Sequence, residues 1–145
     1  MPGDVISIVF PGQGSQKPGM LASYFENISS FRETFSEASD HLGIDLLDLV
    51  NNGTDEDLSK TTVTQPLMLT AGISIWRSLP LSLKSEVKYL AGHSLGEYSA
   101  LVASEAFNFQ DGLKLVAQRA KLMQEAVPIG EGGIAAILGL PISKI

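Results

Sequence analysis

The amino-acid sequence predicts an α/β fold built around a largely parallel sheet. Three short apolar segments are typical of strands, and between them lie segments whose apolar residues recur at helical spacing. Glycine-containing turns follow the first two strand-like segments. Because parallel strands are joined by long crossovers, usually helices, this alternation favours helices packed against a parallel sheet.

Three segments are predicted to be strands. Residues 5–10 (Val-Ile-Ser-Ile-Val-Phe) are mostly β-branched and end at a Pro-Gly pair, so we expect a short, buried strand. Residues 87–91 are predicted to form a second buried strand, and residues 134–140 a third. The sequence ends at Ile145 with no further segment to pair with this third strand, and we therefore expect a truncated chain.

Two helices are predicted between the first two strands. One covers residues 30–42, where apolar residues fall on one face. In the other, Thr64 is the predicted N-cap and Pro66 lies near the start. Residues 51–60 are polar and predicted to form turns, and residues 82–86 are predicted to be a polar connection.

Two more helices are predicted after the second strand. Residues 95–104 combine small and apolar side chains. Asn108, with Asp111 three positions later, is typical of a capping box and begins a helix that runs to about Val127. The glycine-rich residues 128–133 then form a linker.

The composition excludes several classes of protein. The chain has 145 residues, which fits one domain, and its 10 basic and 16 acidic residues give a net charge of −6. This charge argues against a general nucleic-acid or membrane-surface binder. With no cysteine, disulfides are excluded, and with only His41 and His93 a metal centre is not expected.

The sequence shows no sign of a membrane span or a secretory signal. No apolar run reaches the roughly 18 residues that a span needs. The first four residues lack the basic start of a signal peptide. We therefore expect a cytoplasmic protein.

The motif Gly92-His93-Ser94-Leu95-Gly96 matches the pattern G-x-S-x-G between a predicted strand and a predicted helix. This is the setting of a nucleophile elbow, in which a strained turn exposes the serine hydroxyl above the sheet. The amide of Leu95, at the helix N-terminus, is then placed to donate to a developing oxyanion. An ordinary glycine-containing turn is the alternative, but the context favours Ser94 as a nucleophile.

A serine nucleophile needs a general base, and the sequence offers no clear one. His93 adjoins Ser94, but neighbours at such a turn point in different directions. His41 falls on the polar face of its predicted helix, where we expect it to be solvated. In α/β-hydrolase-like chains the base histidine follows the serine, yet no histidine follows Gly96. Either the site works without a histidine or the base histidine lies outside this chain, and we favour the second explanation.

A loop rich in glycine and glutamine, residues 11–19, follows the first strand. It lacks the third glycine of a dinucleotide-binding fingerprint and the Gly-Lys-Ser/Thr ending of a P-loop. Because α/β sheets place ligands at the carboxyl ends of strands, the amide of Gln13 is a candidate second oxyanion donor. An ordinary glycine turn explains the loop at least as well.

Arg119 is the most informative single charge in the last predicted helix. It stands in a row with Leu115, Leu122 and Ala126, so we expect it to interrupt an apolar face. A guanidinium there needs an anion or several acceptors. An internal carboxylate partner, snorkelling to solvent and a bidentate clamp on a substrate carboxylate are all open interpretations.

Taken together, these motifs resemble the malonyl-CoA:acyl-carrier-protein transacylase family of fatty-acid synthesis. The resemblance covers nearly the whole chain, although members of the family are roughly twice this length. The similar segments are residues 10–16 (Phe-Pro-Gly-Gln-Gly-Ser-Gln) with 19–20 (Gly-Met), 64–66 (Thr-Gln-Pro), 91–101 (Ala-Gly-His-Ser-Leu-Gly-Glu-Tyr-Ser-Ala-Leu), and Arg119 with residues 123–128 (Met-Gln-Glu-Ala-Val-Pro).

The resemblance implies a role for each candidate residue. Ser94 is the nucleophile that carries the acyl group as an ester, and the backbone amides of Gln13 and Leu95 form the oxyanion hole. Arg119 pairs with the malonyl carboxylate, and Gln65 lines the acyl pocket. The base histidine and the group that orients it lie in the second half of family members and have no counterpart here.

The resemblance also implies an architecture and a reaction. Residues 1–127 are the N-terminal part of a hydrolase-like acyltransferase subdomain, and residues 128–145 are the linker and first strand of a small ferredoxin-like subdomain, cut short. Malonyl passes from malonyl-CoA to Ser94 and then to the phosphopantetheine thiol of acyl carrier protein, with no metal or redox cofactor. We expect the full-length enzyme to be a monomer and this chain alone to be inactive.

Two other functions remain open on the sequence. A serine hydrolase such as a thioesterase would share the elbow, whereas a non-catalytic fragment or carrier-binding module would need no base. Carrier protein is acidic in such systems, so a net charge of −6 slows docking unless a local basic patch exists. Lys114 and Lys121 are candidates for that patch, although a solvated helix face explains both.

Overall fold

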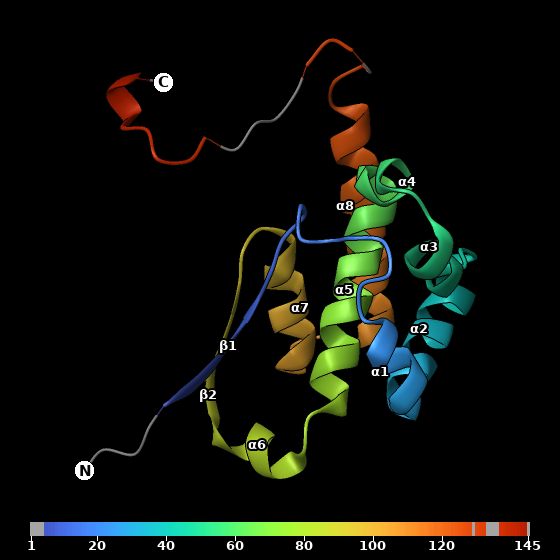
Figure 1. Cartoon of the computed structure of the whole chain (residues 1–145). Coiled ribbons are helices and arrows are strands. Elements are labelled where there is room, and N and C mark those ends of the chain that lie inside the picture. Colours follow the sequence, from blue (N-terminus) through green and yellow to red (C-terminus); the bar gives the residue numbers. More distant parts are fainter. Residues whose placement is uncertain (1–4, 129, 133–136, 145) are drawn as a thin grey trace.

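The computed structural model describes residues 5–128, 130–132 and 137–144. These residues form a two-stranded parallel sheet and are otherwise mostly helical (Figure 1). The predicted α/β class with a parallel sheet is therefore confirmed. In chain order the elements are β1 (Ile6–Phe10), α1 (Ala22–Asn27), α2 (Ser29–Leu42), α3 (Leu46–Asn52), α4 (Asp55–Ser59), α5 (Thr61–Ser78), α6 (Leu81–Glu86), β2 (Val87–Gly92), α7 (Leu95–Ala103), α8 (Phe109–Glu125) and the 3-10 helix η1 (Ile142–Lys144).

The sheet packs against helices on one face only. Side chains alternate across a strand, so Ile8, Phe10 and Leu90 face the core, while Val9 and Tyr89 face away and are 70% and 66% exposed. Figure 1 shows the long helices gathered on one side of β1 and β2. The prediction that both strands are buried is therefore wrong for one face, because no described element covers it.

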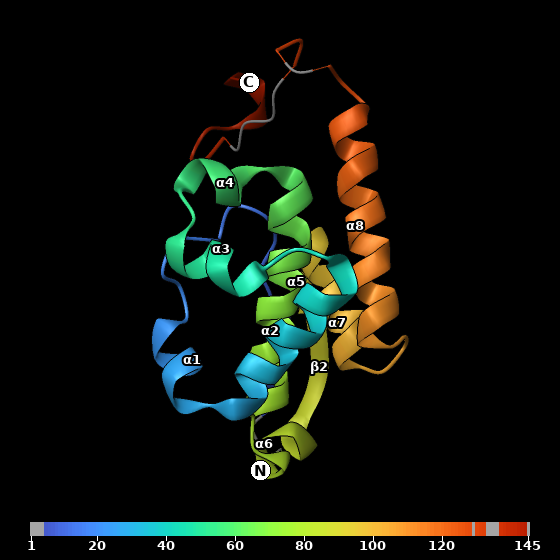
Figure 2. The ribbon, with the colours of Figure 1, turned by 90° about the vertical axis from the view of Figure 1, so that its right-hand side faces the viewer.

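The helix α5 lies at the centre of the core. Its residues from Thr64 to Ala71 are all buried, and it packs against α2, α7 and α8 (Figure 2). Burial on all faces is typical of a helix in the interior of a domain, and α5 is such a helix. From α2, Phe31 and Phe35 stack with their ring centroids 5.5 Å apart and have no exposed surface.

Three of the predicted helices are confirmed. The helix predicted over residues 30–42 is α2, and the one predicted over 95–104 is α7. At the start of α8, the Asn108 side chain accepts a hydrogen bond from the Asp111 amide at 2.8 Å. This contact is the cap that the sequence predicts.

The start of α5 and the polar segment before it differ from prediction. Thr64 is not an N-cap, because α5 begins at Thr61 and the Thr64 hydroxyl donates to the Lys60 carbonyl at 3.0 Å inside the helix. The segment predicted to form turns contains α4, whose start is a reciprocal capping box of Thr54 and Asp57. That spacing was present in the sequence and could have predicted α4.

Two other predicted segments have different outcomes. The predicted polar connection at residues 82–86 is part of the short helix α6. Residues 134–136 of the predicted third strand lie outside the described residues, and residues 137–140 form no strand.

Candidate active site

Ser94 lies in a tight turn between β2 and α7. Its backbone has φ 54° and ψ −107°, a conformation that a residue with a side chain adopts only under strain. A Cβ atom on Gly92 would come within 1.9 Å of the Gly96 carbonyl carbon, and one on Gly96 within 2.1 Å of the Phe10 carbonyl oxygen. Both glycines of the motif are therefore required by close backbone approach, and Ser94 is left exposed at the turn.

The loop after β1 lies against this turn. A Cβ atom on Gly12 would come within 2.9 Å of the His93 carbonyl oxygen, and the His93 amide donates to the Phe10 carbonyl at 3.2 Å. Gln13 is exposed, and its side-chain amide donates to the Thr61 hydroxyl at 3.1 Å. The structure thus brings the glutamine loop beside the serine turn, while the role of the Gln13 backbone amide stays a prediction.

Arg119 on α8 points at Ser94. Its Nη2 donates to Ser94 Oγ at 3.0 Å, and its Nη1 donates to Gln65 Oε1 at 2.7 Å. The guanidinium carbon also lies 5.7 Å from the centroid of the Tyr98 ring, within range of a cation–π contact. Residues of α5, of α7 and of the turn that precedes α7 therefore surround one cation on α8.

The surroundings of Arg119 differ in part from prediction. The buried side of α8 carries Leu113, Val116 and Ala120, whereas Leu122 in the Arg119 row is 56% exposed. This row does not face the core, and Arg119 does not interrupt a buried apolar face. It instead borders an open, largely apolar hollow that is lined by Tyr98, Leu115, Gln118, Arg119, Leu122, Met123 and Ala126.

The described part of the chain contains no carboxylate within salt-bridge distance of Arg119. Both side-chain oxygens that accept from its guanidinium, on Gln65 and Ser94, are neutral. The interpretation with an internal carboxylate partner is therefore not observed. The cation keeps further N–H donors for an anion that reaches Ser94.

Gln65 on α5 is the second residue that contacts Arg119. It has no exposed surface, and its Nε2 donates to Met123 Sδ at 3.2 Å while its Oε1 accepts from Arg119. Both ends of the amide are thus in use. The sequence places Gln65 at the site through resemblance alone, and no local spacing rule predicts that its partner is Arg119.

No base for Ser94 is found among the described residues. No hydrogen bond links the ring of His93 or His41 to Ser94, and His41 lies half-buried on α2.

The described residues also contain no cluster of three or more His, Asp or Glu side chains that could hold a metal ion. Within those same residues, no helix is both long and apolar enough to cross a membrane.

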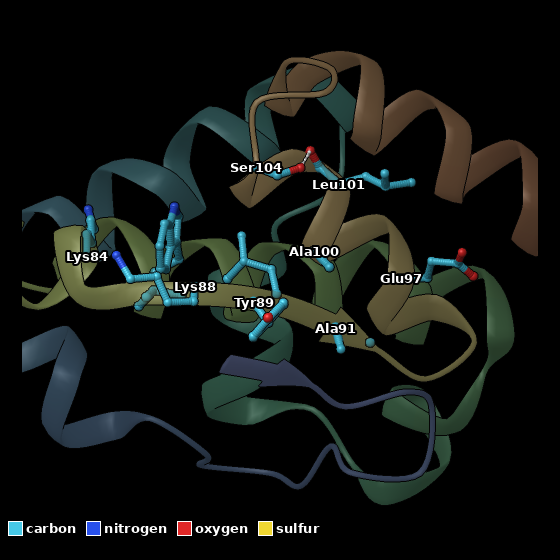
Figure 3. Close-up of a pocket in the computed structure, with 12 residues that line it drawn as sticks. Lys84, Lys88, Tyr89, Ala91, Glu97, Ala100, Leu101 and Ser104 are labelled. Atoms are coloured by element: carbon cyan, nitrogen blue, oxygen red, sulfur yellow. Dashed lines mark hydrogen bonds between the residues drawn. The ribbon is translucent and has the colours of Figure 1, made fainter. Parts of the chain in front are cut away.

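A wider hollow, of about 810 Å³, lies away from this chemistry between β2 and α7. Figure 3 shows Lys84 and Lys88 toward one end and Glu97 toward the other, with the Ser104 hydroxyl bonded to the Leu101 carbonyl. Ser94 and Arg119 do not line it. We therefore place the candidate site at the serine turn and not in this larger space.

The chain belongs to the acyl transferase domain family, which it matches over residues 8–142. Among its relatives, the malonyl CoA-acyl carrier protein transacylase of Salmonella typhimurium is 50% identical over 139 residues, which are 96% of this chain and 45% of the relative. The protein of the same name from Haemophilus influenzae is 53% identical over 137 residues, 92% of this chain and 43% of its own length.

The chain is also similar to solved structures of transacylases. FabD from Acinetobacter baumannii superposes with a TM-score of 0.83 at 55% identity, covering 95% of this chain and 43% of that one. A malonyl-transacylase solved in complex with a type II polyketide acyl-carrier protein, PlMCAT:AntF, gives a TM-score of 0.79 at 48% identity, covering 86% of this chain and 40% of that one. The chain thus spans less than half the length of these relatives.

Proposed function

We propose that the protein carrying this chain transfers a malonyl group from malonyl-CoA to the phosphopantetheine thiol of acyl carrier protein, through an ester on Ser94. The observation that carries the proposal is the contact between Arg119 and the Ser94 hydroxyl at 3.0 Å. It puts a cation with free donors beside a nucleophile, as transfer of an acyl group with a distal carboxylate requires. The names of the relatives that are 50% and 53% identical to this chain support the same reaction.

Ser94 is the nucleophile in this proposal, at a nucleophile elbow. Its strained backbone, the two glycines and the strand-turn-helix setting all support that role. The amides of Leu95 and Gln13 form the oxyanion hole. Leu95 is the first residue of α7, and an N–H group at that position has no acceptor within its own helix. The Gln13 loop lies against the residue before Ser94.

The transfer occurs in two steps. Ser94 Oγ attacks the thioester carbon of malonyl-CoA, its proton passes to the base, and the C–S bond breaks. Coenzyme A leaves as a thiol after taking that proton. In the second step the carrier thiol loses its proton to the base and attacks the ester carbon. The C–O bond then breaks, and the proton returns to Ser94. These steps use no metal or redox cofactor.

Arg119 selects the acyl group in this proposal. Its guanidinium binds the malonyl carboxylate, which reaches it from the acyl carbon bound at Ser94. The open hollow beside Arg119 supports this role, since it leaves the cation accessible. No described carboxylate competes for it.

In this proposal the base and most of the second subdomain lie in the part of the relatives that this chain does not span. We infer that the base histidine lies there. In the same proposal residues 1–127 form part of the hydrolase-like subdomain and residues 128–145 begin a ferredoxin-like one. The chain covers 40–46% of these solved relatives, so more than half of each relative lies outside the part that matches.

Docking of an acidic carrier is not supported by the two lysines singled out on α8. Lys114 lies 3.7 Å from Asp111, and Lys121 lies 3.9 Å from Glu125, so an acid accompanies each of them on the exposed face. This pairing favours a solvated helix face over a basic docking patch.

The proposal is tested by intact-mass analysis of the enzyme made from its complete reading frame. Brief incubation with malonyl-CoA should add one malonyl group, and Ser94→Ala should abolish the adduct. Acyl carrier protein should then remove the group from the wild-type enzyme and become malonylated. An enzyme that folds and binds malonyl-CoA but forms no adduct would disprove the proposal, and release of free malonate in place of transfer would favour a hydrolase.

A further inference from the structure

The amide of Gln65 has only one orientation that satisfies its neighbours. Arg119 carries donors alone, so it must meet the carbonyl oxygen of Gln65. The NH₂ group then points away from Arg119 and toward Met123, whose thioether sulfur is a weak acceptor at 3.2 Å. Rotating the amide by half a turn would set NH₂ against the guanidinium and leave two donors facing each other.

Arg119 and Met123 occupy neighbouring positions on one face of α8. They are four residues apart, which is the spacing at which helical side chains lie one above the other. A single buried side chain from α5 therefore contacts both. Its oxygen holds the cation, and its nitrogen is held by the sulfur one turn further along.

These contacts restrict the rotamers of the Arg119 side chain. An arginine loses about 2 kcal/mol of rotamer entropy when it is fixed, and a preformed geometry avoids that loss during binding. With Nη1 held by Gln65, the guanidinium fork is fixed with Nη2 directed at Ser94. A fully buried amide is a rigid support, because it has no access to water as an alternative partner.

We propose that Gln65 and Met123 are positioning residues for Arg119: the Met123 sulfur fixes the Gln65 amide, whose oxygen fixes the guanidinium that recognises the acyl carboxylate. Gln65 therefore contributes to acyl selectivity through Arg119 and not by touching the acyl group. This inference rests on the proposed function, in which Arg119 binds malonyl.

The test compares the rates at which malonyl-CoA and acetyl-CoA acylate Ser94 in the complete enzyme. Met123→Leu keeps the volume but removes the acceptor, so the malonyl-to-acetyl ratio should fall about threefold to tenfold. Gln65→Glu keeps the size of the side chain but pairs Arg119 with an internal carboxylate, which competes with the malonyl carboxylate. The malonyl-to-acetyl ratio should therefore fall about tenfold or more, as expected when a hydrogen bond to a charged group is lost. The loss should appear chiefly as a raised KM for malonyl-CoA, because ground-state and transition-state binding weaken together.

Met68→Leu is the matched control, since Met68 is a buried methionine on α5 with no part in this contact chain. It should leave the ratio unchanged. In an Arg119→Ala background, Met123→Leu should cause no further change in the ratio. A purely structural role predicts instead that both substrates slow equally in every background.

The outcomes separate the inference from the function on which it rests. If wild-type enzyme forms a Ser94 adduct and Arg119→Ala lowers the ratio, while Met123→Leu and Gln65→Glu do not, the positioning role is wrong and the proposed function stands. If wild-type enzyme forms no adduct at all, both are overturned.

Discussion

The Arg119 guanidinium donates directly to the Ser94 hydroxyl at 3.0 Å, so the cation and the serine of the strained turn are in contact. A malonyl ester on Ser94 would place its carboxylate within reach of the same guanidinium. In the proposed function, Ser94 reacts with one end of the acyl group and Arg119 recognises the other, so this short distance fits a short dicarboxylic acyl group.

Replacing Arg119 should remove most of the preference for malonyl over acetyl groups. Arg119→Ala should lower the malonyl-to-acetyl ratio of kcat/KM by about tenfold to a hundredfold, because a hydrogen bond to a charged group contributes about 1.5–3 kcal/mol. Arg119→Lys is the comparison, since it keeps the charge but loses the planar fork, and we expect an intermediate ratio. An unchanged ratio in Arg119→Ala would refute the clamp.

The backbone strain at Ser94 should lower the free energy of unfolding by a measurable amount. Ser94→Gly relieves a φ of 54°, whereas Ser94→Ala retains a Cβ atom in the same conformation. We therefore expect the glycine variant to exceed the alanine variant in free energy of unfolding by about 1 kcal/mol, measured by urea denaturation of the complete enzyme. Equal stabilities would show that the turn is not strained.

The elements that the sequence predicts correctly depend on residues close together in the chain. The spacing of Asn108 and Asp111 predicts the start of α8, and the two glycines around Ser94 predict the turn after β2. Both are local devices, in which a cap or a close backbone approach is decided within a few positions. Polar composition alone concealed α4, although its Thr54–Asp57 box followed the same rule.

The rest of the site is non-local and could not be derived from spacing. Gln65 and Arg119 are 54 positions apart, and only the packing of α5 against α8 brings them together. Periodicity gives the row on α8 that contains Arg119 but does not say what covers it. For the same reason the sequence predicts buried strands, while Val9 and Tyr89 are exposed on the open face of the sheet.

The glycines should differ in how well they tolerate alanine. Gly43 ends α2 with φ 67° and open space around it, so Gly43→Ala should lower the free energy of unfolding by only about 1 kcal/mol. In Gly96→Ala the new Cβ would lie 2.1 Å from the Phe10 carbonyl oxygen, and the backbone must move. We expect a loss of about 3 kcal/mol or more, together with slower acylation of Ser94. Similar losses in the two variants would contradict the close approach.

The carboxyl group of Asp57, which belongs to the capping box of α4, should titrate at an unusually low pH. Hydrogen bonds from the Lys60 ammonium, and then from Thr54, lower the pKa of Asp57 from 3.8 to about 2. The sign follows from a folded-state pKa below the unfolded one: the contribution to stability is full above about pH 4 and is lost as the pH falls toward 2. NMR titration of the Asp57 carboxyl group should find this value, and Lys60→Ala should raise it. An Asp57 pKa near 3.8 in the unmodified protein would contradict the contact.

Residues 1–145 expressed alone should not acylate Ser94. In the described residues neither histidine bonds to Ser94, and a serine hydroxyl without a base is a poor nucleophile at neutral pH. Exposed apolar side chains on the open sheet face, including Val9 and Tyr89, should also make the isolated chain prone to association. Incubation with malonyl-CoA, followed by intact-mass analysis, should show no adduct on the isolated chain and one adduct on the complete enzyme. If the isolated chain forms the adduct at the rate of the complete enzyme, these residues contain their own base, and the assignment of that role to a histidine elsewhere fails.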